Sequence, residues 1–232
     1  MTEKILLAPG YNIINDKNFA KITSKLEEFT TLIGKSLNEL KYRGKRNPNN
    51  FKGFLGGHPI SMNKKLLREM KVETDKYLIC EKTDGVRYML ITLSNGMFFL
   101  MGRSSNKDSS IKNNYFLTNF SNLPANYYNE ENIILPNIDL VNLFDGELVR
   151  DEIKGKSHYQ YLIFDTIQCG INSYIPKESY DIRLECAKRF IESIKTLKEF
   201  DESLNVKKTS LRETILKPFP VVNIKFKDFF KA

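Results

Sequence analysis

Apolar residues in two stretches of the chain recur every three or four positions, which is the spacing of an amphipathic helix. The first stretch covers residues 17–33, with Asp16 placed to cap its first turn and Gly34 after its last. The second begins at Asp181, another candidate cap, and continues to about Phe200. Its apolar face consists of Leu184, Ala187, Ile191, Ile194 and Leu197. We expect both helices to bury these faces in a core.

Strand-forming residues dominate the middle of the chain. The segments concerned are 77–81, 87–93, 97–101, 143–149 and 159–165. Asn95 and Gly96, between the second and third segments, are a strong hairpin signal. A polar, Asn-rich stretch, 104–142, separates this hairpin from the last two strands and is expected to hold loops and short pieces. The basic tail from Asn205 is expected to form a loop and then a strand.

Strands that alternate irregularly with helices predict an α+β fold with mixed, largely antiparallel sheets and flanking helices. The 232 residues suffice for one sizeable core. Residues 41–59 are rich in Lys, Arg, Asn, Gly and Pro and mark a loop, which either touches RNA phosphates or serves as a basic connector. We therefore divide the chain into an N-terminal helix with a basic connector, 1–53, and a main domain, 54–232.

Net charge and cysteine content give expectations about the binding partner and the cellular compartment of the protein. The net charge of +8 suits a polyanionic partner such as RNA or a nucleotide, although solvated lysines explain such a charge equally well. No apolar run reaches the length of a membrane span and no signal peptide is visible, so we expect an intracellular protein. Cys80, Cys169 and Cys186 show no close pairing, which predicts buried, unpaired cysteines in a reducing compartment.

Candidate chemistry centres on Lys82, which follows an apolar strand and precedes a tight turn of Thr83, Asp84 and Gly85 and then Arg87. A lysine that attacks phosphorus must be neutral, yet with an ordinary pKa of about 10.4 only about one in 2,500 molecules is neutral at pH 7. Partial burial and the Arg87 cation would lower the pKa of Lys82, whereas Asp84 would raise it. We expect a lowered pKa if burial wins.

The turn resembles the KTDGxR signature of mRNA capping enzymes, within the covalent nucleotidyltransferase superfamily that also contains ATP-dependent DNA ligases and RNA ligases. Further segments match in the family's order. They are Gly56-Gly57-His58-Pro59-Ile60-Ser61, Arg103 after the hairpin, Asp145-Gly146-Glu147-Leu148-Val149 and Tyr161-Leu162-Ile163-Phe164-Asp165. The chain is therefore identified as a member of this family over about residues 54–230.

The resemblance implies the reaction and the nucleophile. Lys82 would attack the α-phosphorus of GTP, expel pyrophosphate and form a lysyl-GMP intermediate, and the diphosphate 5′ end of an RNA would then accept the GMP. The implied cofactor is Mg²⁺ or Mn²⁺.

The resemblance also implies roles for the other matched positions. Pro59, Thr83, Asp84 and Gly85 would contact GTP, and Arg87 and Glu147 would bind its ribose, Glu147 also helping to place the metal. Arg103 would hold ribose or the RNA end, and Phe164 would stack on guanine. Without the other motifs, Phe164 would be read as an ordinary core aromatic and Glu147 as a surface carboxylate.

The sequence departs from the family pattern in two places. Gly102 stands before Arg103 where the family has an acidic residue, and the chain stops before the family's DGLI-like motif, its lysine pair and its OB domain. Lys225 and Lys227 have the spacing of that pair but are read as an earlier basic strand. We expect a partial nucleotidyltransferase domain, similar to the ATP-grasp-like domain of ligases and capping enzymes, with its C-terminal part and OB domain absent.

Three functions remain open from the sequence. The favoured one is an mRNA guanylyltransferase, incomplete as this chain; the others are an ATP-dependent DNA or RNA ligase fragment and a non-catalytic nucleotide- or RNA-binding module. Capping would imply a nuclear location, or a cytoplasmic viral replication site. Its implied partners are an RNA triphosphatase, a cap methyltransferase and the transcription machinery, with no membrane.

Overall fold

A computed structural model describes residues 55–57, 61, 63–69, 77–94, 98–102, 114–117, 119–120, 139–171, 173–203 and 221–231, together with residues 33, 35 and 36. The predicted N-terminal helix lies mostly outside these residues, as do the Asn95-Gly96 turn and most of the basic loop 41–59. Ile33 is helical and fully buried. Lys35 and Ser36 are also helical, so helical structure continues past the predicted end at residue 33. The division at residue 53 stays a prediction.

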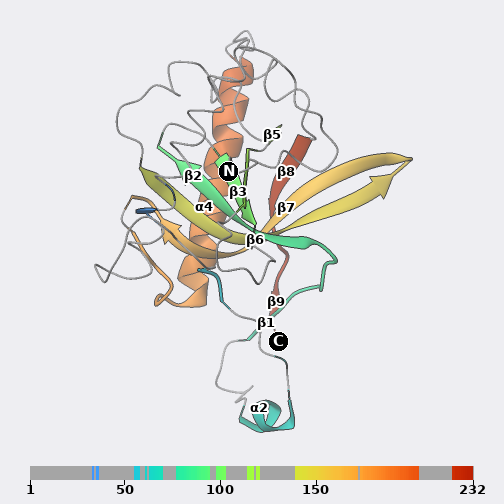
Figure 1. The fold of residues 1–232 in the computed structure, drawn as a ribbon, viewed down its shortest axis with the longest axis vertical. Coiled ribbons are helices and arrows are strands. Elements are labelled where there is room, and N and C mark those ends of the chain that lie inside the picture. The colour runs from blue at the N-terminus through green and yellow to red at the C-terminus, as the bar shows by residue number, and fades with distance from the viewer. Residues whose placement is uncertain are drawn as a thin grey trace, which may run out of the picture.

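A seven-stranded sheet forms the centre of the described structure (Figure 1). Its strands lie in the order β4-β3-β2-β6-β7-β8-β5, and all pairs are antiparallel except β7–β8 and β5–β8. The strands are β2 (Val86–Leu93), β3 (Phe98–Gly102), β4 (Asn114–Leu117), β5 (Asn119–Phe120), β6 (Leu140–Ile153), β7 (Lys156–Cys169) and β8 (Val221–Phe226). The predicted mixed, largely antiparallel α+β fold is confirmed.

The predicted strands are real, but their ends differ from the prediction. The 87–93 and 97–101 segments form the antiparallel pair β2–β3. The 143–149 and 159–165 segments belong to two strands of 14 residues each, β6 and β7, which form one long hairpin that projects from the sheet (Figure 1). Its turn is Lys154-Gly155, with positive φ at both residues, and Ile153 pairs with Lys156 across it.

A small second sheet lies apart from the main one. It consists of β1 (Leu78–Ile79) and β9 (Phe230–Lys231), which run antiparallel. The prediction of a strand over 77–81 was therefore too long, because only two of its residues have a partner strand. Helix α2 (Lys64–Glu69) precedes β1, and none of its residues is buried.

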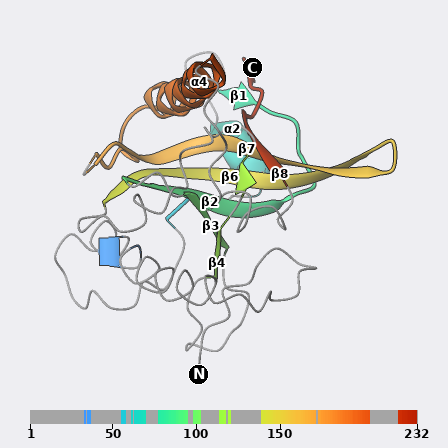
Figure 2. The same ribbon diagram turned by 90° about the horizontal axis from the view of Figure 1, so that it is seen from above.

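Helix α4 (Tyr180–Ser203) covers one face of the main sheet (Figure 2). Its buried residues include Leu184, Ala187 and Ile194, as predicted, but Leu197 is 43% exposed. Helical spacing defines the side of a helix that faces the sheet, not how far along the helix the sheet extends. The helix begins at Tyr180, so Asp181 lies in its first turn and is not the cap.

The cysteine prediction was wrong. Cys169 and Cys186 form a disulfide that joins the end of β7 to α4, and Cys80 is exposed. The two partners lie 17 residues apart, and they meet because the chain reverses after β7 and packs α4 back onto that strand. The cysteines therefore give no support for a reducing compartment. Within the described residues, no helix has the length and apolar character needed to cross a membrane.

Candidate functional site

Lys82 lies in the segment that connects β1 to β2, four residues before β2 begins. Strand β2 follows the Lys82 turn and β6 contains Glu147; the two strands are antiparallel neighbours, and Arg87 stands opposite Glu147 in their register. Residues 60 positions apart in the sequence therefore share one site.

The turn after Lys82 is held by the carboxylate of Glu147. The Thr83 hydroxyl donates a short hydrogen bond to Glu147 Oε2, and the Gly85 amide donates to Oε1 over 3.0 Å. Both oxygens of one strand-borne carboxylate thus bind the turn. This arrangement fixes the backbone on either side of Asp84 and anchors the residue that follows Lys82.

Gly85 is required here for space. A Cβ at this position would lie 2.6 Å from Glu147 Cγ and 2.6 Å from the Leu148 carbonyl oxygen. Both distances are far below ordinary carbon contacts, and the second involves backbone. The close approach that lets Glu147 reach the Gly85 amide therefore excludes any larger residue.

Lys227 enters the same site from the segment between β8 and β9. Its backbone amide donates to the Ile163 carbonyl over 2.9 Å, and its side chain is only 10% exposed. The ammonium donates to Thr83 Oγ1 over 3.0 Å and lies 3.4 Å from Glu147 Oε2. The sequence led us to interpret Lys227 as part of a basic strand and not as one of the family's lysine pair, whereas its side chain contacts the turn after Lys82.

Lys82 itself is exposed, and its partner is Asp84. The ammonium lies 2.7 Å from Asp84 Oδ1, and both side chains are largely in solvent. The hydrogen bond to Asp84 is the main reason that the pKa of Lys82 is raised, and the same contact lowers the pKa of Asp84. The expected net lowering of the pKa of Lys82 is therefore not found, because the Asp84 carboxylate raises this pKa by more than desolvation lowers it.

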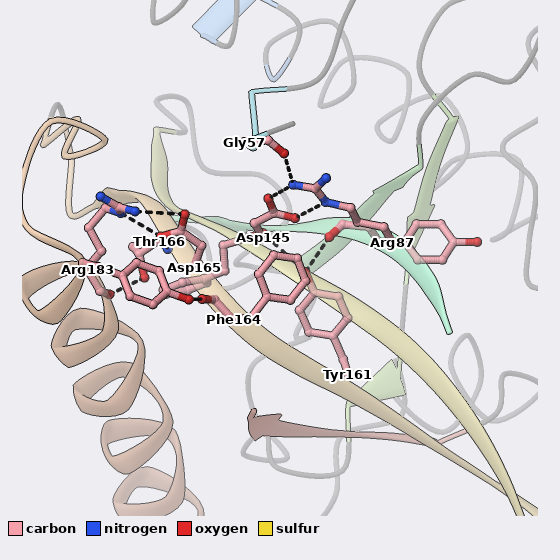
Figure 3. A network of polar contacts seen from close by, with 11 residues as sticks. Gly57, Arg87, Asp145, Tyr161, Phe164, Asp165, Thr166 and Arg183 are labelled. Atoms are coloured by element: carbon pink, nitrogen blue, oxygen red, sulfur yellow. Dashed lines mark hydrogen bonds and ion pairs between the residues drawn. The ribbon is translucent and has the colours of Figure 1, made fainter. Parts of the chain in front are cut away.

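Arg87 forms an ion pair with Asp145 (Figure 3). Its Nε donates to Asp145 Oδ1 over 2.9 Å, a second nitrogen makes a short bond to Oδ2, and the same nitrogen donates to the Gly57 carbonyl over 2.7 Å. Asp145 is fully buried, and burial raises its pKa despite the opposing effect of Arg87. The pair ties the Gly56-Gly57 segment to the sheet.

Phe164 lies beside both cations. The guanidinium carbon of Arg87 is 5.5 Å from the centre of the Phe164 ring, and Lys227 Nζ is 5.9 Å from it. The ring occupies a bulge in β7: Gly146 pairs with Ile163 and Asp145 with Asp165, so Phe164 has no partner on β6. Bulges of this kind re-aim a side chain next to functional sites.

Two predicted site residues, Pro59 and Arg103, lie outside the described residues. Gly57, two residues before Pro59, does contact the site, because its carbonyl oxygen accepts a hydrogen bond from Arg87. Strand β3 ends at Gly102, the residue before Arg103, and Gly102 pairs with Tyr88, next to Arg87.

The described side chains around Glu147 form no ready-made metal site. Glu147, the predicted ligand, uses both oxygens for Thr83 and Gly85 and has an ammonium beside one of them. Among the described residues, no three His, Cys, Asp or Glu side chains gather as a ligand set. We therefore derive no step through a metal bound by Glu147.

Comparison with known proteins decides the family. The family described as mRNA capping enzyme, catalytic domain, matches residues 10–231. The chain belongs to this family. The matched range includes the Lys82 turn, the Glu147 strand and the Lys227 segment, so the residues that meet in the site all come from the part that defines a capping enzyme domain.

Several curated capping enzymes are similar to the chain. The mRNA-capping enzyme subunit alpha of Schizosaccharomyces pombe is 31% identical over 175 residues, covering 72% of this chain and 37% of that protein. The mRNA-capping enzyme of Mus musculus is 29% identical over 141 residues, covering 61% of this chain and 21% of that protein. The subunit alpha of Candida glabrata is 28% identical over 130 residues. The chain thus spans between 21% and 37% of the length of these relatives.

Sequence reasoning missed two residues of this capping-family site, Asp145 and Lys227. Asp145 stands two positions before Glu147 on the same strand, and this alternation is a signal that points both side chains to one face. For Lys227 the signal is its spacing from Lys225, which is that of the family's lysine pair, but the two lysines were interpreted as an earlier basic strand.

Proposed function

We propose that this chain carries the nucleophile-bearing part of an mRNA guanylyltransferase, which transfers GMP from GTP through Lys82 to the diphosphate 5′ end of RNA. The observation that carries the proposal is the contact of Glu147 with Thr83 and Gly85. It joins two segments with the capping-enzyme pattern into a single site around the proposed nucleophile.

The proposed chemistry has two steps that balance. In the first, the neutral amine of Lys82 attacks the α-phosphorus of GTP; an N–P bond forms, the bond to the bridging oxygen breaks, pyrophosphate leaves and the amine proton passes to solvent. In the second, a terminal phosphate oxygen of the RNA attacks the same phosphorus, the P–N bond breaks and Lys82 recovers a proton. The product is GMP joined to RNA through a triphosphate bridge.

The Lys82–Asp84 ion pair sets a condition for the first step. An ammonium bonded to a carboxylate is not a nucleophile, so the pair must separate when GTP binds. The triphosphate carries several negative charges and can replace Asp84 as the partner of the cations around the turn. We propose that substrate binding and release of Lys82 are coupled in this way.

The remaining residues serve to bind and orient the nucleotide. Phe164 offers a ring face for the base, and Lys227 and Arg87 supply positive charge next to that ring. Each carboxylate oxygen of Glu147 can accept two hydrogen bonds, so Oε1, which binds the Gly85 amide, can also accept one from a ribose hydroxyl. For Pro59, Arg103, Thr83, Asp84 and Gly85 we keep the GTP-contacting roles that the resemblance implies.

Cofactor, partners and location are proposed from the family. Mg²⁺ or Mn²⁺ would be bound mainly by the triphosphate oxygens, because magnesium commonly binds through substrate phosphates and few protein carboxylates. The metal would supply charge neutralisation at the leaving pyrophosphate. We further propose RNA 5′ ends as acceptors, association with a triphosphatase, a cap methyltransferase and the transcription machinery, and a nuclear location, with a cytoplasmic viral replication site as the alternative.

One labelling experiment tests the proposed function. The protein is incubated with magnesium and α-labelled GTP or ATP, and acid-labile, protein-bound label is measured. We expect label from GTP in the wild type and none in Lys82→Ala. Lys65→Ala, which removes another exposed lysine, serves as the matched control and should label normally.

Other outcomes of that experiment favour other functions. Label from ATP would support a ligase fragment. No label, together with measurable RNA binding, would support a non-catalytic module and contradict the proposal.

A further inference from the structure

The first turn of α4 makes a set of contacts with the bulged part of β7 (Figure 3). The hydroxyl of Tyr180 donates a short hydrogen bond to the carbonyl oxygen of Phe164. Arg183 binds Asp165 through both oxygens, at 2.8 and 3.3 Å. The Thr166 hydroxyl donates to the Arg183 carbonyl over 2.7 Å. Three consecutive residues of β7 are thus bound to one helical turn.

These contacts lie at the bulge of β7, where neither neighbouring strand pairs with Phe164. Phe164 is the extra residue of the bulge and has no partner on β6, and β8 pairs with β7 only as far as Ile163. A half-buried carbonyl at such a point needs a donor from elsewhere, because an unpaired buried polar group is costly. Tyr180 supplies that donor.

Tyr180 is itself held firmly. Its ring meets Phe229 edge-on at 5.9 Å, and the Arg183 guanidinium lies 5.1 Å from the ring centre on one face. Burial raises the pKa of Tyr180, so its hydroxyl stays protonated and able to donate at any pH used for an enzyme assay. Phe229 follows Lys227 by two residues, so the same tyrosine also contacts the segment that brings Lys227 to the site.

We propose that Tyr180 is a positioning residue for the nucleotide: by holding the Phe164 carbonyl, it aims the Phe164 ring at the place where the base stacks. The inference rests on the proposed function, which assigns Phe164 to the base. Tyr180 and Lys82 act on different parts of the substrate. Loss of the Tyr180 hydroxyl should therefore weaken nucleotide binding while leaving the transfer step nearly unchanged.

The first test is Tyr180→Phe, which keeps the ring and its contact with Phe229. The dissociation constant for labelled GTP is measured by equilibrium dialysis, and KM and kcat are measured for formation of the lysyl-GMP adduct. We expect a rise of about five- to tenfold in the dissociation constant and in KM, as for loss of one hydrogen bond, with kcat within about twofold. Tyr159→Phe removes a hydroxyl from the same strand away from the bulge and should leave GTP binding unchanged.

A double-mutant cycle separates this role from general stabilisation. If Tyr180 acts through Phe164, then Tyr180→Phe should change GTP binding by less than about twofold in a Phe164→Ala background. Thr166→Val is a second, isosteric variant that removes another of the three contacts, and it should weaken GTP binding in the same direction. Equal effects of Tyr180→Phe with and without Phe164 would overturn the inference, as would unchanged binding in both single variants.

The readouts also keep the two proposals apart. A wild type that binds GTP and shows the coupled cycle, but forms no adduct on Lys82, would overturn the proposed function and leave the role of Tyr180 standing. A wild type that forms the adduct while Tyr180→Phe retains its GTP affinity and KM would do the opposite. A wild type that binds no nucleotide would overturn both.

Discussion

At the scale of single residues, the nearest carboxylate, Asp84, has the largest effect on the pKa of the proposed nucleophile, Lys82. The hydrogen bond and charge of Asp84 raise the pKa of Lys82 by more than desolvation lowers it, because both side chains are largely exposed. The free protein therefore does not favour the neutral amine of Lys82. Reactivity has to come with the substrate, whose phosphates compete for the same cations.

Removing the Asp84 charge should change the pH dependence of adduct formation. With Asp84→Asn the raised pKa of Lys82 falls toward its ordinary value, so the neutral amine becomes available at lower pH. Because kcat/KM reports the free enzyme, its alkaline rise should move to lower pH in the variant. A pH profile of the labelling rate for both proteins checks this. An unchanged rise, or one displaced to higher pH, would contradict the account.

Gly85→Ala tests the close contact between the turn and Glu147. The new Cβ would overlap Glu147 Cγ and the Leu148 carbonyl, so Glu147 must move and release Thr83. Overpacking of this kind costs about 1–3 kcal/mol of unfolding free energy, and we expect the labelling rate to fall at least tenfold. Urea unfolding and the GTP-labelling assay measure the two effects. Val86→Ala alters the exposed neighbour and should change neither; equal behaviour of the two variants would argue against the contact.

At the scale of elements, the strand pair β2–β6 contains the buried carboxylate of Asp145, which forms an ion pair with Arg87. Asp145 has no exposure, and Arg87 opposes the rise that burial causes in its pKa. The site is thus held together by an ion pair whose removal from one side leaves a buried carboxylate unpaired, which is costly.

Arg87→Met should therefore destabilise the protein in a pH-dependent manner. Without Arg87 the pKa of Asp145 rises further above its unfolded value. A carboxyl with a raised folded-state pKa adds stability below its unfolded pKa, and that stability is lost as pH rises through the folded pKa. We expect a loss of about 3 kcal/mol at neutral pH and a smaller loss in acid. Urea unfolding at both pH values measures it; an equal loss at both would contradict the assignment.

The β6–β7 hairpin offers a test that is independent of function. Lys154 has φ of 51°, in the left-handed region that Asn and Gly adopt more readily than Lys. Lys154→Asn, giving an Asn-Gly turn, should stabilise the protein by about 0.5–1 kcal/mol. Lys156→Asn, just after the turn, is the control and should give no gain. Chemical denaturation decides, and a destabilised Lys154→Asn would refute the turn geometry.

At the scale of the whole molecule, the sequence predicted what depends on local pattern. The hairpin β2–β3, the strands β6 and β7 and the helix α4 follow from alternation and helical spacing, which are properties of neighbouring residues. The identity of Lys82 and Glu147 as site residues followed from matched segments in the right order. The contact of Glu147 with Thr83, the residue after Lys82, agrees with that order.

What the sequence did not predict depends on how distant segments pack. The bulge at Phe164 arises from the register of β6 against β7, and the arrival of Lys227 from the parallel pairing of β7 and β8. The disulfide between Cys169 and Cys186 needs α4 to fold back on β7. The pKa of Lys82 needed the position of one side chain relative to another. No local pattern encodes these features.

The central claim is that Lys82 takes GMP from GTP. The most direct measurement is mass spectrometry of peptides from the protein after incubation with GTP and magnesium, and in parallel with ATP. The account predicts a GMP adduct on the lysine at position 82 and no AMP adduct. An adduct on another lysine, an AMP adduct on Lys82, or no adduct at all would contradict it.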